Sequence, residues 1–134
     1  MQAIILPATL ATAAAAALCN LWLAMRIGAL RNREKVLIGD GGHPLLIARM
    51  RAQANFVEYT PIFLILMALV ELAGGMTLAL WIIGALYIVA RILHGLGLDK
   101  PTINALRGIG IGVTLLTTLI LAGWAVSLAW AAMP

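Results

Sequence analysis

Residues 45–73 read LLIARMRAQANFVEYTPIFLILMALVELA, and this stretch decides the fold. Its first third is polar and the rest is apolar, and it exceeds the about 20 residues that cross a bilayer as a helix. Three further apolar segments surround it, at residues 3–25, 76–98 and 103–132. Because lipid cannot satisfy open backbone groups and the segments are too long for barrel strands, all four are predicted to be membrane helices.

Turn-forming residues separate the four segments. They are Gly39–Pro44, Gly74–Gly75 and Gly97–Pro101. Pro44 and Pro101 are expected in the first turns of the second and fourth helices. The sequence therefore predicts an all-α integral membrane four-helix bundle, a single domain over residues 1–134 with helices at about 3–30, 45–73, 76–98 and 102–132.

The composition supports membrane insertion. Hydrophobic residues make up 63% of the 134 residues and charged residues 10%, whereas a soluble domain carries about 25% charged residues. The mean hydropathy is +1.05. These values exclude a soluble enzyme and a disordered chain, and the single cysteine, Cys19, excludes a disulfide scaffold.

The basic side chains predict an orientation rather than a nucleic-acid partner. The net charge is +4, and all nine Lys and Arg lie between Arg26 and Arg107, without the basic patch with interleaved aromatics that binds a single strand. They gather around the first and third connections. By the positive-inside rule, loops one and three face the cytoplasm of a bacterial inner membrane, and both termini face the periplasm. The residues expected at the membrane interfaces are Trp22, Trp81, Trp124 and Trp130.

Two stripes of polar side chains lie within the predicted membrane helices. At 100° per residue, Arg51, Asn55 and Glu58 fall within about 60° on one helix face. The third helix carries a similar stripe of Tyr87, Arg91 and His94. Ionisable side chains at membrane depth are costly unless they are paired or face water, which makes them candidates for a functional site. The alternative is a buried Arg–Glu pair that only fixes the helix register.

Other residues predict local structure. Pro61 removes a backbone hydrogen bond in the second helix, so a kink or a local cavity is expected there. Glu71 is interpreted as an interfacial residue at the helix end rather than a proton carrier. Gly108 and Gly112 have the small-xxx-small spacing that is typical of close helix packing.

The stretch at residues 51–61, RAQANFVEYTP, resembles the helix-two signature of the MAPEG superfamily. These are membrane-associated proteins in eicosanoid and glutathione metabolism, and they include microsomal glutathione transferases, microsomal prostaglandin E synthase and leukotriene C synthase. Arg91-x-x-His94 in the third segment and Arg107 at the start of the fourth fit the same pattern, and the Gly-Asp-Gly-Gly loop at residues 39–42 is similar to that of bacterial members. The resemblance spans nearly the whole chain.

The resemblance implies a homotrimer that binds glutathione, as thiol co-substrate, between neighbouring subunits near the cytoplasmic end. Arg107 matches the arginine that stabilises the thiolate, and Arg31 lies where some members carry a second functional arginine. The positions that match glutathione-binding residues are Arg51, Gln53, Asn55, Glu58, Tyr59, Arg91 and His94. Leu98 stands where eukaryotic enzymes have a tyrosine, and Gly108 stands where the prostaglandin synthase branch has a serine, which argues against prostaglandin isomerisation.

The residue types suit this chemistry. Glutathione has two carboxylates and one ammonium group, and Arg51, Arg91 and Glu58 supply the complementary charges of both signs. A thiol reacts as its thiolate, and a nearby arginine lowers the thiol pKa from about 8.5. Arg107, at a predicted helix N-terminus, suits that role. The expected function is a glutathione-dependent membrane transferase or peroxidase that acts on apolar electrophiles or lipid hydroperoxides.

Three other functions stay open. The first is a non-catalytic lipid-binding member of the same superfamily, which glutathione binding would distinguish. The second is a small multidrug exporter, but such proteins carry a key glutamate in the first helix, and residues 3–30 contain no acid. The third is a purely structural assembly unit. The expected partners are two further copies of the chain, membrane lipids and a hydrophobic small-molecule substrate, and no metal site is expected because the possible ligands are too dispersed, namely Asp40, His43 and His94.

Overall fold

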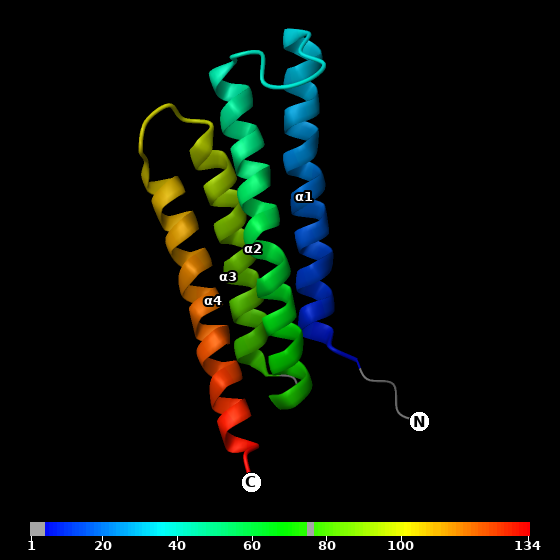
Figure 1. The fold of residues 1–134 in the computed structure, drawn as a ribbon, viewed down its shortest axis with the longest axis vertical. Coiled ribbons are helices and arrows are strands. Elements are labelled where there is room, and N and C mark those ends of the chain that lie inside the picture. The colour runs from blue at the N-terminus through cyan, green and yellow to red at the C-terminus, as the bar shows by residue number, and fades with distance from the viewer. Residues whose placement is uncertain (1–4, 75–76) are drawn as a thin grey trace.

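The computed structural model describes residues 5–74 and 77–134, and these residues form four long helices (Figure 1). The helices are α1 Pro7–Glu34, α2 Pro44–Gly74, α3 Leu78–Leu98 and α4 Ala105–Ala131. Each of them is long and apolar enough to cross a membrane. The described residues contain no strand, and the predicted all-α four-helix bundle is confirmed.

The helices run alternately up and down (Figure 1). The connections α1–α2 and α3–α4 lie at one end of the bundle, and the start of α1 and the end of α4 lie at the other. α2 and α3 pack together, α1 packs on both of them, and α4 also packs on both. The first and third connections, which carry the basic residues, therefore share one end of the molecule.

Local capping sets where the helices begin. α2 begins at Pro44, as predicted, because proline suits the first helical position. α4 begins at Ala105, so the prediction that Pro101 lies in its first turn is wrong. The reason is Asn104, whose side-chain oxygen accepts a hydrogen bond from the Arg107 backbone N–H (3.2 Å) and caps the helix.

The bounds of α1 and α3 can be compared with the prediction only in part. α1 continues past the predicted end at residue 30 to Glu34, where Lys35 adopts a left-handed conformation (φ 56°) that ends the helix. The predicted start of the first helix at residue 3 lies outside the described residues. The same holds for the predicted turn residue Gly75 and the predicted start of the third helix at Met76.

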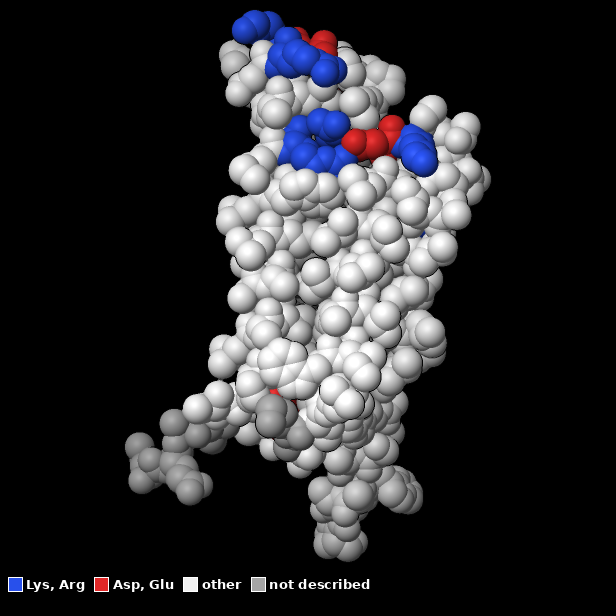
Figure 2. Space-filling model, turned by 180° about the vertical axis from the view of Figure 1, so that it is seen from behind, with Lys and Arg blue, Asp and Glu red and all other residues white. Residues whose placement is uncertain are grey.

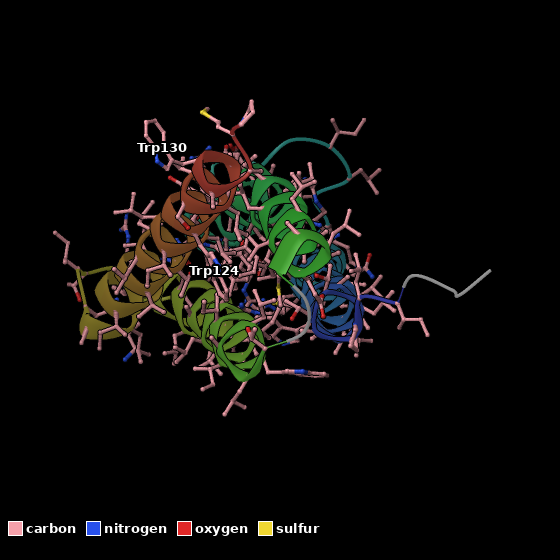
Figure 3. All side chains as sticks on the ribbon, turned by 90° about the horizontal axis from the view of Figure 1, so that it is seen from below. Trp124 and Trp130 are labelled. Carbon is pink, nitrogen blue, oxygen red and sulfur yellow. The ribbon has the colours of Figure 1, made fainter. Side chains whose placement is uncertain are left out.

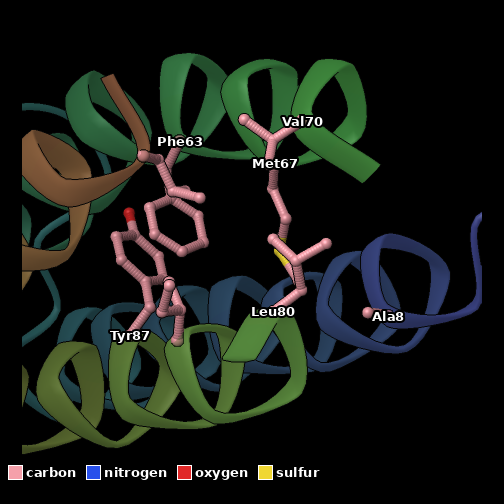
Figure 4. Close-up of a cluster of buried hydrophobic side chains, with 8 residues drawn as sticks. Ala8, Phe63, Met67, Val70, Leu80 and Tyr87 are labelled. Carbon is pink, nitrogen blue, oxygen red and sulfur yellow. The ribbon is translucent and has the colours of Figure 1, made fainter. Parts of the chain in front are cut away.

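The largest core cluster of the described residues joins side chains from all four helices, and Figure 4 shows part of it. Phe63 and Tyr87 stack with their ring centroids 3.7 Å apart, and Met67 and Leu80 are fully buried beside them. The Tyr87 hydroxyl lies 2.9 Å from the Thr60 hydroxyl and forms a hydrogen bond with it. Tyr87 of the predicted third-helix stripe therefore belongs to the core.

Glu71 caps the start of α1. It lies near the end of α2, as predicted, and its side chain is only 2% exposed. Its two oxygens accept the backbone N–H groups of Ala8 (2.9 Å) and Thr9 (2.8 Å). The N-cap Leu6 has no side-chain oxygen for these groups, so a carboxylate from α2 satisfies them at the positive end of the α1 dipole.

The tryptophans do not share one environment. Trp130 projects from the outside of the bundle, whereas Trp124 points between the helices and packs against the core cluster (Figure 3). Trp81 is exposed, and Trp22 lies under the Arg26 guanidinium, whose carbon is 4.6 Å from the ring centroid. Trp124 therefore contributes to packing rather than to an interfacial belt.

α3 and α4 approach each other closely at Gly110, which is not part of the predicted Gly108–Gly112 pair. A Cβ on Gly110 would lie 2.6 Å from the His94 backbone nitrogen and 2.7 Å from the Ala90 carbonyl oxygen. Gly108 and Gly112 have nothing within 4 Å of such a Cβ. The predicted packing role of that pair is therefore wrong within the single chain.

Candidate functional site

Charged side chains gather at the end of the bundle with the first and third connections, above a wide band with almost no charged surface on the face shown in Figure 2. There Asp99, just after α3, forms ion pairs with Arg26 of α1 and Arg49 of α2 (3.1 Å to Arg49). Arg49 also donates to the Arg26 carbonyl oxygen (3.0 Å). This network joins three helices at the charged end.

A hollow of about 750 Å³ lies at this end, between α2, the end of α3 and the start of α4. Its lining brings together five of the predicted site residues from three helices, namely Arg51, Asn55, Tyr59, His94 and Arg107. Leu98 also lines it, with Asp99 and Lys100 from the α3–α4 connection. The hollow therefore combines several cationic groups with hydrogen-bonding groups and an aliphatic wall.

α2 presents three of these residues because they follow a spacing of four. Arg51, Asn55 and Tyr59 lie on successive turns of one helix face. Glu58, which the predicted stripe included, is exposed and lines neither of the two hollows described for this chain. Pro61 lies inside α2 without ending it.

Arg91 lies behind the hollow and is 1% exposed. Its Nη2 donates to Asn55 Oδ1 (3.0 Å) and its Nη1 donates to Thr114 Oγ1 (3.4 Å). The guanidinium carbon lies 5.9 Å from the ring centroids of both Phe56 and Tyr59. In the described residues no carboxylate forms an ion pair with Arg51 or Arg91, so within one chain neither stripe contains the alternative, a buried Arg–Glu register pair.

His94 joins the end of α3 to the start of α4. Its Nδ1 lies 3.2 Å from the Arg107 carbonyl oxygen. Because a carbonyl oxygen only accepts hydrogen bonds, Nδ1 is the donor in this contact. Asn104 adds a second link by donating to the Gly97 carbonyl oxygen (2.8 Å), and the backbone of Arg107 lies so close to Gly97 that a side chain there would collide with it.

Arg31 and Gln53 lie elsewhere. They line a second hollow of about 480 Å³ beside α1 and α2, together with Ile27, Met50, Ala54 and Val57. Arg31 donates to the Leu37 carbonyl oxygen (3.4 Å), and Gln53 Nε2 donates to Asn20 Oδ1 (3.4 Å). Within one chain, these two predicted site residues are therefore separate from the five that meet in the first hollow.

Three residues at the site were not singled out from the sequence. Asp99 and Lys100 were interpreted only as turn and topology residues, and the partners of Asp99 come from other helices, so no local spacing signals them. Asn104 did carry a signal, because an asparagine three residues before Arg107 has the spacing of an N-cap.

The bundle and its cationic hollow define a small helical membrane protein with a polar site at its charged end. The MAPEG family model matches residues 9–127, and the chain belongs to this family of membrane proteins. Similar curated relatives are the inner membrane proteins YecN of Escherichia coli strain K12 and of Escherichia coli O6:H1. Each is 37% identical over 68 residues, which cover 51% of this chain and 52% of the relative. The match thus spans about half the length of these relatives.

Proposed function

We propose that this protein is a glutathione-dependent transferase or peroxidase of the bacterial inner membrane. The observation that carries the proposal is the convergence of Arg51, Asn55, Tyr59, His94 and Arg107 on one hollow. Membership of the MAPEG family, which includes glutathione transferases, supports this class of activity. The relatives named as inner membrane proteins support the location.

Groups in and beside the hollow suit each part of glutathione. The Arg51 guanidinium and the Lys100 ammonium suit its two carboxylates. The Asn55 oxygen is already occupied by Arg91, so its amide N–H groups remain to donate to a ligand. Two carboxylates suit the ligand ammonium: Asp99 lines the hollow but already binds two arginines, whereas Glu58 is exposed and lies outside the lining.

Arg107 supplies the activation of the thiol. It lies in the first turn of α4, where the helix dipole also favours an anion, and its side chain is exposed at the hollow. The S–H proton passes to water, and the thiolate sulfur forms a bond to an electrophilic carbon as the leaving group departs with its electron pair. With a hydroperoxide, the thiolate attacks the terminal oxygen and the O–O bond breaks to give a sulfenic acid and an alkoxide, which takes a proton from water to become the alcohol. A second glutathione converts the sulfenic acid to a disulfide and water.

The two separate hollows support a site shared between subunits. One chain offers Arg51 and Arg107 in the first hollow and Arg31 and Gln53 in the second. In the proposed homotrimer, the second hollow of one subunit faces the first hollow of the next, which adds Arg31 and Gln53 to the five predicted residues of the first hollow. The charged end faces the cytoplasm, where the thiol is supplied, and a hydrophobic substrate enters from the bilayer.

The first prediction concerns the number of chains in the assembled protein. If the site is shared in this way, the purified protein is expected to be a trimer in mild detergent. Light scattering corrected for bound detergent measures the number of chains per particle. A monomer or dimer that still binds glutathione with a single affinity would contradict the shared site.

Glutathione titration of the detergent-purified protein tests the proposed function. The thiolate absorbance is expected to rise to saturation near neutral pH, where free glutathione is mostly the thiol. S-methylglutathione is the matched control, because it has the same charges but no ionisable sulfur, and it is expected to compete without producing the signal. Glutathione binding without thiolate would favour a non-catalytic member of the family, and no binding would overturn the proposal.

A further inference from the structure

We propose that His94 is a positioning residue for Arg107. The His94 side chain contacts the backbone of Arg107, at the start of α4, and not the Arg107 side chain. The inference rests on the proposed function, because it assigns to His94 the task of keeping the thiolate-stabilising guanidinium at the hollow. His94 is 5% exposed and comes from α3, whereas Arg107 comes from the next helix. Their link is the hydrogen bond from His94 Nδ1 to the Arg107 carbonyl oxygen (3.2 Å).

The start of α4 depends on a few contacts with α3. Its first turn is capped by Asn104, which also donates to the Gly97 carbonyl oxygen (2.8 Å). One turn further on, Gly110 lies against the backbone of α3. The His94 bond lies between these two contacts and acts on the residue whose side chain enters the hollow. Its loss leaves the Arg107 carbonyl without this donor and removes one of the contacts that hold the first turn to α3, so the turn shifts or rotates more readily.

A shift of the first turn matters more for chemistry than for capture. Thiolate stabilisation requires the guanidinium at the sulfur, and a displacement of about 1 Å is enough to cost up to about 100-fold in rate. In the proposed site, the groups that match the carboxylates of glutathione are Arg51 and Lys100, which do not depend on the first turn of α4. A positioning role therefore predicts loss of thiolate and turnover with binding largely retained.

The two ring nitrogens of His94 are separable by substitution. Asparagine places an amide N–H where Nδ1 stands, so His94→Asn keeps the donor to the Arg107 carbonyl and removes Nε2. Glutamine reaches to the region of Nε2 and leaves the Nδ1 position empty. His94→Leu removes both nitrogens with similar volume. If His94 acts through Arg107, His94→Asn is the variant that restores function.

The experiment compares these variants in glutathione affinity, thiolate absorbance near neutral pH and conjugation rate with an apolar electrophile. His94→Asn is expected to stay within about threefold of the native protein in all three. His94→Gln and His94→Leu are expected to lose about tenfold or more in thiolate signal and rate, with affinity changed by less than about threefold. Tyr87→Phe is the matched control, because it removes a buried hydrogen bond between α2 and α3 away from the hollow, and its thiolate signal is expected to be normal.

Several outcomes overturn the inference. Restoration by His94→Gln and failure of His94→Asn would mean that Nε2 acts directly on the ligand. Native behaviour of His94→Leu would mean that the bond has no role. If His94→Leu does not fold, the comparison of His94→Asn with His94→Gln still tests the inference.

A readout without glutathione separates this inference from the proposed function. Hydrogen exchange of the backbone amides in residues 105–110, followed by mass spectrometry, reports how firmly the first turns of α4 are held. Exchange is expected to be faster in His94→Gln and His94→Leu than in His94→Asn and the native protein. If the native protein forms no thiolate but exchange follows this order, the proposed function fails and the contact stands. If the native protein forms thiolate but exchange and signal ignore the substitutions, the inference fails and the function stands.

Discussion

Replacement of Arg107 by leucine is expected to lower turnover by about 100- to 1,000-fold, the loss seen when a group that stabilises developing negative charge is removed. The guanidinium interacts more strongly with sulfur as the proton leaves, so its loss affects the reactive state more than the bound thiol. Arg107 is exposed at the hollow and its side chain forms no hydrogen bond within the described residues, so its removal leaves no buried group without a partner. Thiolate absorbance near neutral pH is expected to disappear while glutathione still binds.

Arg51→Leu is the matched variant, because the same leucine removes the same charge from the same hollow. Here the expected loss is in capture, by about 1.5–3 kcal/mol of binding free energy, the usual scale of a hydrogen bond to a charged group. Binding, thiolate formation and turnover are measured for both variants. A normal thiolate signal and normal turnover in Arg107→Leu would show that the assigned role is wrong, and Arg31 would be the next residue to replace.

The helices and part of the candidate site were predictable because they depend on local periodicity. Apolar length predicted four membrane helices, and the spacing of Arg51 and Asn55 on one helix face predicted a polar stripe that does line the hollow. Tyr59 rather than Glu58 continues that stripe. The angles between residues of a single helix predict which side chains share a face. They do not predict which of those side chains a neighbouring helix covers.

The remaining contacts depend on pairs of residues from different helices. Glu71 lies at a helix end in the sequence, yet its role comes from the N–H groups of Ala8 and Thr9, more than sixty residues away. Asp99 likewise acquires its role from arginines of α1 and α2. Nothing in the local pattern around either acid signals these partners, since the helix packing that creates them is set by all four helices together.

The second large effect is expected at Gly110, where alanine replaces hydrogen by a methyl group. The new Cβ would lie 2.6 Å from the His94 backbone nitrogen and 2.7 Å from the Ala90 carbonyl oxygen. These are helix backbone atoms that do not move as a side-chain end does, so α3 and α4 must separate. Overpacking of this kind costs about 1–3 kcal/mol and occasionally more. The free energy of unfolding, measured by titration with a denaturing detergent, is expected to fall by that amount.

Gly112→Ala is the control on the same helix. It makes the same chemical change where nothing lies within 4 Å of the added carbon, and alanine is a better helix former than glycine by up to about 1 kcal/mol. The two substitutions are therefore expected to change stability in opposite directions. Gly110→Ala is also expected to weaken the thiolate signal, because His94 and Arg107 lie on the two helices that it forces apart. Equal stability of the two variants would contradict the close α3–α4 contact on which the placement of Arg107 depends.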